Sequence, residues 1–310
     1  MSYSFFFMWP VRAVVFLLLP LMAFVSAAPG PGQGTIERVP EIKSRYVMPR
    51  NVDVWLPPGY TPDKKRYAVL YMHDGQNVFD PKNSFKGVAW EVDSVLTGLL
   101  GRKQVRDCIV VGIWNTPKRV VEYTPASPYA ELPAPMRTGY EQALGSGPVS
   151  DAYLKYVVNE VKPYIDQHYR TRPDRAHTFI MGSSMGGLIS LYAALEYPQV
   201  FGGAGCVSTH WPLGLDPKAS AFTNAMLRYL NAKLPTVRKP KLYFDYGTAT
   251  LDAGYEPHQL RVDSLLRAKG YGPSHWLTRK FAGAAHDEVS WQQRVEVPLR
   301  FLLGKEQPRR

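Results

Sequence analysis

The chain has 310 residues, of which 45% are hydrophobic and 20% charged. This composition excludes a disordered or low-complexity protein and favours one globular domain with a full hydrophobic core. The 37 basic residues outnumber the 26 acidic ones, which favours anionic surroundings such as lipid headgroups or acidic glycans, but no recognition-module signature makes nucleic acid an expected partner.

The first 28 residues have the pattern of an export signal. Arg12 is followed by the apolar run AVVFLLLPLMAFV, and SAAPG then supplies the small residues of a signal-peptidase site. We expect cleavage after Ala27 or Ala28 and an exported protein, periplasmic or extracellular. Residues 29–310 then form a single domain with 36 basic and 26 acidic residues, a charge of +10 with histidine neutral.

An uncleaved membrane anchor is the alternative for this leader. The apolar run of 13 residues is interrupted by Pro20, which makes it short for a membrane span. Contact with a membrane is therefore expected only through the leader, and only where the leader is not cleaved.

Short β-branched or aromatic runs alternate with helical patterns along the rest of the chain. We expect strands within 51–60, 66–75, 108–115, 177–182, 202–211, 241–247 and 275–283. We expect helices from Asp151 to about Ile165 with a kink at Pro163, over 186–197, around 218–232 and around 257–269. Strands that alternate with helices predict an α/β fold with a largely parallel sheet covered on both faces.

Two further features of the chain are a long Pro-, Gly- and Ala-rich segment and a pair of cysteines. The segment from about Thr124 to Gly147 is rich in Pro, Gly and Ala and has no clear period, which predicts a long excursion over one end of the sheet. Cys108 and Cys206 are too few for a disulfide framework and each lies in an apolar run. This favours two buried thiols over one bridge, although the sequence leaves a bridge open.

The residues FIMGSSMGG at 179–187 lie between a predicted strand and a predicted helix. In that context the pattern G-x-S-x-G is typical of a nucleophilic serine on a sharp turn. Only Ser184 fits the pattern, because Gly182 precedes it by two residues and Gly186 follows it by two. The turn holds its hydroxyl clear of the sheet at the amino end of a helix, where the dipole favours negative charge. A purely structural turn is the alternative.

A nucleophilic serine requires a base, and in this architecture serine, acid and histidine follow in that order along the chain. We expect His286 to be the base, because it follows the last strand in FAGAAHDEVSW, where small residues leave room for an imidazole. His258 falls on a helix and His275 at the start of a strand, so both are expected to be structural or exposed.

Three carboxylates end or follow the strand KLYFDYG, namely Asp245, Asp252 and Glu256. We favour Asp252 as the acid because it lies in the loop beyond the strand end, and Asp245 is the second choice. The acid would hold the tautomer of the imidazole and stabilise the imidazolium.

These motifs together resemble the esterase D group of α/β hydrolases, which includes enterochelin esterases, feruloyl esterases and mycolyltransferases. The resemblance rests on GSSMGG, HDGQNVF, EYTP, VKPYIDQHYRTRPD and the closing G-x-x-H-D-x-x-x-W, and spans nearly all of residues 51–303. It implies Ser184 as nucleophile, His286 as base, and an oxyanion hole from the backbone N–H groups of Met185 and Gln76. One departure concerns the acid, because many relatives place it close after the Gly-Thr at this strand end, where this chain has GTAT.

Other candidate residues have less specific patterns. His73 and Asp74 are expected to shape their turn, with Asp74 bonding to nearby backbone N–H groups. His210 and Trp211 follow a predicted strand and are candidates for substrate contact, unless the Trp simply packs. No metal ligand set and no cofactor is expected, since neither H-E-x-x-H nor a Cys/His spacing is present.

The sequence thus predicts an exported serine hydrolase that cleaves a small-molecule or glycan carboxylic ester through an acyl-enzyme. Acyl transfer to an alcohol or sugar by the same residues is one alternative, and a catalytically inactive envelope-binding relative is another. Aromatic and basic residues in or near the excursion could receive an aromatic or anionic acyl group, with ordinary surface packing as the alternative. These residues are Arg119, Tyr123, Tyr129, Arg137 and Tyr140.

Overall fold

The protein is described by a computed structural model that covers residues 32–39, 41–62, 65–214, 216 and 219–305. The expected export signal, residues 1–28, lies outside the described residues. In the part of the chain that the structure describes, no helix is both long and apolar enough to cross a membrane.

The centre of the fold is an eight-stranded sheet with the order β1-β2-β4-β3-β5-β6-β7-β8. The pairs β1–β2 and β2–β4 are antiparallel, and all other neighbours are parallel. The strands are β1 Thr35–Val39, β2 Val52–Leu56, β3 Ala68–His73, β4 Cys108–Ile113, β5 Thr178–Ser183, β6 Gly203–Val207, β7 Lys241–Gly247 and β8 Trp276–Phe281. The predicted α/β class with a mostly parallel sheet is confirmed, and β1 is an additional strand that follows the Gly-rich start.

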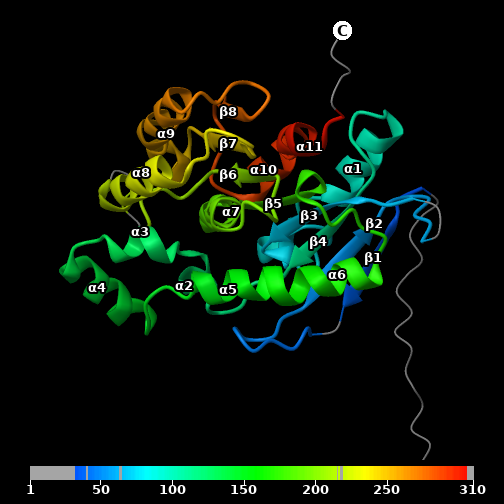
Figure 1. Cartoon of the computed structure of the whole chain (residues 1–310), viewed down its shortest axis with the longest axis horizontal. Coiled ribbons are helices and arrows are strands. Elements are labelled where there is room, and N and C mark those ends of the chain that lie inside the picture. The colour runs from blue at the N-terminus through cyan, green and yellow to red at the C-terminus, as the bar shows by residue number, and fades with distance from the viewer. Residues whose placement is uncertain (1–31, 40, 63–64, 215, 217–218, 306–310) are drawn as a thin grey trace, which may run out of the picture.

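Helices cover both faces of the sheet (Figure 1). One face carries α1 Val92–Gly101, α10 Glu288–Arg294 and α11 Glu296–Leu303, and the other carries α5 Ser150–Tyr156, α6 Lys162–His168, α7 Met185–Glu196, α8 Ala221–Lys233 and α9 Glu256–Ala268. Successive strand residues point into the two cores in turn. Tyr71 of β3 faces the helices α5 to α9, whereas Leu70 faces α1, α10 and α11. Both faces of the central strands are therefore buried, as a parallel sheet requires.

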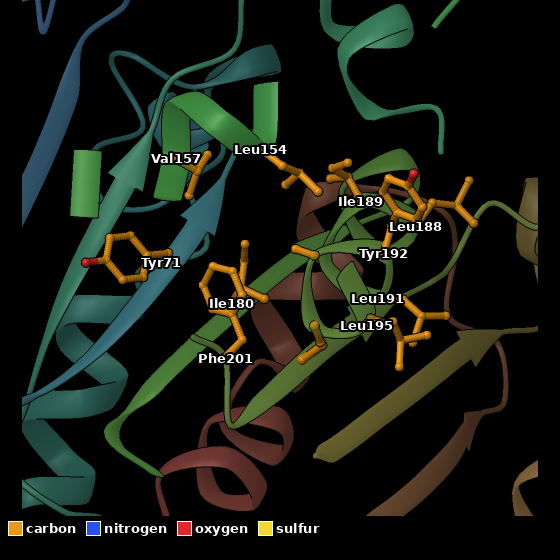
Figure 2. Close-up of a cluster of buried hydrophobic side chains, with 14 of the residues drawn as sticks. Tyr71, Leu154, Val157, Ile180, Leu188, Ile189, Leu191, Tyr192, Leu195 and Phe201 are labelled. Atoms are coloured by element: carbon orange, nitrogen blue, oxygen red, sulfur yellow. The ribbon is translucent and has the colours of Figure 1, made fainter. Parts of the chain in front are cut away.

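The larger core forms where α5 and α7 pack on β3 and β5. Ile180 and Tyr71 project from the strands, and the rings of Tyr71 and Phe201 meet edge to face at 6.4 Å between centroids. Figure 2 shows these side chains beside those of the two helices. Every residue of α7 from Met185 to Leu195 is buried, so this helix is fixed on the sheet directly behind the serine turn.

The helix expected from Asp151 with a kink at Pro163 is present as three consecutive pieces. α5 ends at Tyr156, a π-helical turn η3 covers Val157–Val161, and α6 begins at Lys162. Pro163 lies in the first turn of α6. Because proline has no N–H for the helix ladder and its ring crowds the preceding turn, the irregular turn falls directly before it.

The segment from about Thr124 to Gly147, in which the sequence shows no clear period, contains two helices. This region contains α3 Ala126–Ala130 and α4 Ala134–Leu144 and follows α2 Arg119–Tyr123. None of the residues of α4 is buried, so no apolar period marks that helix in the sequence. α3 packs against α8, and α2 packs against α5 and α7.

The two cysteines are free and buried in β4 and β6. Burial raises the pKa of the Cys108 thiol to about 12 and that of Cys206 well above its usual range, so both behave as small core residues. The 3₁₀ turns are η1 Gly75–Asn77, η2 Phe85–Gly87, η4 Arg175–His177 and η5 Thr250–Gly254.

Candidate active site

Ser184 occupies a strained turn between the end of β5 and the start of α7. Its φ of 58° and ψ of −120° lie in a region that residues with a Cβ rarely adopt. A Cβ on Gly182 would lie only 2.9 Å from the backbone carbon and oxygen of Gly186, so the close approach of strand and helix requires glycine there. The backbone N–H of Ser184 donates to the carbonyl of Val207 at 2.8 Å, which ties the turn to β6.

Ser184, His286 and Asp252 form a continuous hydrogen-bonded chain. The Ser184 Oγ lies 2.9 Å from His286 Nε2, and His286 Nδ1 lies 2.5 Å from Asp252 Oδ1. The backbone N–H of His286 donates to Thr250 Oγ1 at 2.8 Å, which fixes the histidine loop on η5. The imidazole side chain is 12% exposed and the carboxylate is fully buried.

Several donors converge on the second oxygen of Asp252. The hydroxyl of Ser208 donates to Oδ2 at 2.6 Å, and so does the backbone N–H of Gly247 at 2.6 Å. Burial opposes ionisation, but the hydrogen bonds from His286, Ser208 and Gly247 and the nearby histidine charge outweigh it and lower the pKa of Asp252. The carboxylate is thus ionised at neutral pH and accepts from the imidazole.

Asp245 does not share this arrangement, although it ends the same strand. Its carboxylate accepts from Arg294 Nη2 at 3.1 Å, from the Tyr243 hydroxyl at 2.8 Å and from the Ser208 backbone N–H at 3.1 Å. Burial, partly offset by Arg294, raises its pKa. Glu256, the third carboxylate considered, forms an exposed pair with Lys280 at 2.7 Å.

The other two histidines considered as bases lie elsewhere. His258 is buried on α9, with Nδ1 2.9 Å from Thr223 Oγ1. His275 precedes β8, and its Nδ1 lies 2.9 Å from the hydroxyl of Ser274. Of the three histidines, His286 is the one whose ring nitrogen lies beside Ser184.

Sequence reasoning missed Ser208, which joins several parts of the site. Besides donating to Asp252, its hydroxyl accepts from Trp291 Nε1 at 3.0 Å and from Arg294 Nη2 at 2.7 Å. Its φ of 42° places it in the left-handed region. The available signal was a polar residue directly after β6, at the edge of the sheet where Ser184 also lies.

The two residues expected to supply the oxyanion hole, Met185 and Gln76, lie at the start of α7 and in η1. Met185 is the first residue of α7, where the N–H has no acceptor within the helix. Gln76 lies in η1, directly after β3, and its side-chain oxygen accepts from the backbone N–H of Asn115 at 3.2 Å. A Cβ on Gly75 would overlap the backbone of Gly112 on β4, at 2.3 Å from its carbonyl carbon, so only glycine lets this turn pack against the sheet.

The turn that carries Gln76 is anchored by Asp74, and the expected bonds to nearby backbone N–H groups are replaced by side-chain partners. Arg119 Nε and Nη2 donate to the two carboxylate oxygens at 2.7 and 2.8 Å, and Asn115 Nδ2 donates at 2.6 Å. The backbone N–H of Asp74 reaches the Tyr123 hydroxyl at 3.3 Å. Burial opposes ionisation, but Arg119 and Asn115 outweigh it and lower the pKa of Asp74.

A cavity of about 380 Å³ opens over Ser184 and His286. Its walls combine aromatic and charged side chains, namely Phe85, Lys86, Arg119, Glu288 and Trp291. The Phe85 ring is 62% exposed. Ser184 thus lies in a recess that can hold a small organic group.

The family model described as "Putative esterase" matches residues 45–301. The chain belongs to this esterase family. A relative of Bacillus subtilis (strain 168), "Uncharacterized protein YbbA", is 27% identical over 262 residues, which cover 83% of this chain and 93% of that protein.

Two solved structures with the same fold are described as esterases. A ferulic acid esterase superposes with a TM-score of 0.62 at 20% identity, covering 87% of this esterase and 98% of that chain. The enterobactin esterase FES from Shigella flexneri gives a TM-score of 0.62 at 18% identity, covering 88% of this esterase and 61% of that chain. The α/β-hydrolase fold and the activity class of carboxylic ester hydrolase follow from these matches and the family.

Trp211 does not lie at the cavity of this esterase, contrary to the expectation of substrate contact. It is 1% exposed in the core beside Phe244, and its Nε1 donates to Gln259 Oε1 at 3.1 Å. His210 is 8% exposed, with Nδ1 2.5 Å from the Tyr255 hydroxyl. Burial, followed by the charge of His286, lowers its pKa to about 4.

The tyrosines considered for the acyl group are engaged in structure. Tyr123 and Tyr129 are buried, and the Tyr140 hydroxyl donates to Thr124 Oγ1 at 2.8 Å. Arg119 is the one residue of that set that lines the cavity over Ser184. His73 lies behind the cavity, with Nδ1 2.7 Å from the Tyr153 hydroxyl. Within the described residues, no group of three or more His, Cys, Asp or Glu side chains is arranged to hold a metal.

Proposed function

We propose that this esterase is a serine hydrolase that works through an acyl-enzyme, with Ser184 as nucleophile, His286 as general base and Asp252 as the acid that orients it. The observation that carries the proposal is the chain from Ser184 Oγ to His286 Nε2 at 2.9 Å and from Nδ1 to Asp252 at 2.5 Å. A nucleophile, its base and an orienting acid within hydrogen-bond reach are the geometry that this chemistry needs.

The protonation states follow from the acid. An ionised carboxylate only accepts hydrogen bonds, so His286 Nδ1 carries the proton and Nε2 is left as an acceptor for the Ser184 hydroxyl. As Ser184 Oγ bonds to the ester carbonyl carbon, its proton passes to Nε2. The carbonyl oxygen becomes an oxyanion, which the N–H groups of Met185 and Gln76 receive beside the positive end of α7.

Collapse of the tetrahedral species breaks the ester C–O bond. The imidazolium of His286 gives its proton to the leaving alcohol, and the acyl group stays on Ser184. Water then donates a proton to His286 as its oxygen attacks the acyl carbon, and a second collapse releases the acid and returns the proton to Ser184. Asp252 stabilises the imidazolium in both halves of the cycle.

The cavity supports an aromatic acyl group with polar or anionic substituents as the substrate class. Phe85 and Trp291 offer apolar surface for a ring, and Lys86 and Arg119 offer donors for oxygen substituents. The structural relatives named above are esterases of ferulic acid and enterobactin. The sequence of residues 1–28 supports export to the periplasm or the medium, and the mass of the secreted chain would show whether it starts at residue 28 or 29.

The experiment is labelling of the purified protein with a fluorophosphonate, followed by peptide mass analysis. We expect the label on Ser184, and loss of both label and p-nitrophenyl ester turnover in Ser184→Ala. Ser190→Ala is the matched control, because it removes a hydroxyl on the same helix that is bound to the Gly186 carbonyl at 2.7 Å. A folded Ser184→Ala protein that keeps its turnover would refute the assignment.

A further inference from the structure

A second and larger cavity lies at the opposite edge of the sheet. It has a volume of about 600 Å³ and is lined by residues at the amino ends of the parallel strands, among them Ala68 of β3, Phe179 of β5 and Lys241 of β7. Ser184 follows the carboxyl end of β5. Five residue steps along that strand separate Ser184 from Phe179 by about 16 Å, so a ligand in this cavity is remote from the esterase site.

The lining of this cavity is strongly basic. It includes seven Lys and Arg side chains and two histidines, and Asp107 is the one carboxylate among its described lining residues. Asp107 is itself paired with Lys65 at 3.0 Å. The nearby Asp174 pairs with His177 at 2.8 Å. Among the described residues, both of these carboxylates therefore have a basic partner.

Several of the basic side chains donate to backbone carbonyls. Arg175 donates to the carbonyls of Pro198 and Arg238 at 2.6 and 2.7 Å, and Lys239 donates to Gly270 at 2.6 Å. Arg106 reaches carbonyls at the end of α11 in the same way. These contacts fix the cationic groups in place before any ligand arrives.

The carbonyl partners lie just beyond the carboxyl ends of α7, α9 and α11. Each helix end carries roughly half a negative charge, so three ends offset only part of the basic lining. Burial, followed by the charge of Arg238, lowers the pKa of Arg175, which is consistent with an excess of positive charge.

We propose that this cavity binds a small anion with two or more phosphate groups. Arg66, Arg106, Arg172 and Arg175 line it, and guanidinium forks match phosphate oxygens in pairs. The volume lies within the range of small-molecule sites, and a recess encloses a discrete charged group better than a flat surface does.

Arg66 and Arg172 are the residues to change, because both are exposed and lie on adjacent chain segments. The Arg66 side chain makes one bond to the Thr171 carbonyl at 3.0 Å. We would measure binding of inorganic pyrophosphate by calorimetry in about 150 mM salt, a concentration that screens weak surface attraction. The double variant Arg66→Gln/Arg172→Gln is expected to bind at least tenfold more weakly, since it loses two guanidinium groups that would make charged hydrogen bonds to the phosphates.

The matched control is Lys43→Gln/Lys155→Gln, which removes the same charge from exposed positions outside the cavity. It is expected to bind pyrophosphate as the unchanged protein does. A parallel arm uses neutral lipid vesicles with and without cardiolipin, whose headgroup carries two phosphates, to tell a membrane headgroup from a soluble phosphate. Binding in either arm that weakens only in the arginine variant supports the site. Absence of binding in both arms, or equal weakening in the control variant, would overturn it.

Discussion

Changing Asp252 to Asn would test the proposed triad most directly. The Asp252 carboxylate accepts from His286 Nδ1 at 2.5 Å, while its other oxygen accepts from Ser208 and Gly247. Because those two donors would hold the amide oxygen of the Asp252→Asn variant on their side, the new NH₂ group faces the imidazole. His286 must then accept at Nδ1 and carry its proton on Nε2, where it no longer takes the proton of Ser184.

The expected result is a fall in kcat of about 10⁴ with little change of fold, as an amide at this position causes in a template triad. That factor corresponds to about 5.4 kcal/mol of activation free energy. The assay is turnover of a p-nitrophenyl ester, with far-UV circular dichroism and urea unfolding to show that the variant is folded. Turnover within tenfold of the unchanged protein would refute the assigned role of Asp252.

Asp245→Asn is the matched control, because Asp245 lies on β7, the strand that precedes Asp252. Asp245 makes no contact with His286 in the structure and instead pairs with Arg294 inside the protein. Breaking a buried ion pair typically costs about 3 kcal/mol or more of stability. We therefore expect a large loss in the free energy of unfolding but a kcat within about tenfold when measured on folded protein. A loss of kcat as large as that of Asp252→Asn would transfer the orienting role to Asp245.

Two further predictions concern stability. Gly182→Ala should lower the free energy of unfolding by about 1–3 kcal/mol, because the new Cβ would lie 2.9 Å from the Gly186 backbone. Urea unfolding measures this loss, and an unchanged midpoint would contradict the close packing of the turn. Burial lowers the pKa of His73 to about 3 and that of His210 to about 4, so the unfolded chain takes up their protons first as the pH falls below about 6.5. Stability should then fall by about 2–2.5 kcal/mol per pH unit between pH 6 and 4.5. His73→Gln, which keeps an acceptor for Tyr153, should halve that slope in urea titrations at several pH values, and an unchanged slope would show that His73 does not stay neutral.

Much of the site was predictable because its residues lie at the ends of strands. Ser184 was recognisable from a strand, a glycine-flanked serine and a helix in succession. Asp252 and His286 each follow a strand that pairs in parallel beyond β5 and β6. Parallel strands bring their carboxyl ends to one edge of the sheet, so three residues distant in sequence were expected to meet there, and the structure places them within hydrogen-bond reach.

The expectations that failed depended on side-chain direction or on exposed helices. Trp211 lies beyond a strand end as expected, but its ring turns into the core, where Gln259 supplies the partner that a buried indole N–H needs. Nothing in the local sequence reveals a partner 48 residues away. α4 was not predicted because it buries none of its residues and therefore shows no apolar period in the sequence.

The choice between Asp245 and Asp252 follows from the geometry of β7. Asp245 is still within the strand, paired in register with Val207, so its carboxylate lies between Tyr243 and Arg294. Asp252 lies in η5, after the chain has left the sheet, and there its carboxylate reaches both Ser208 and His286. A residue inside the strand is held by the pairing of the sheet, whereas the turn beyond it can bring a carboxylate up to the imidazole.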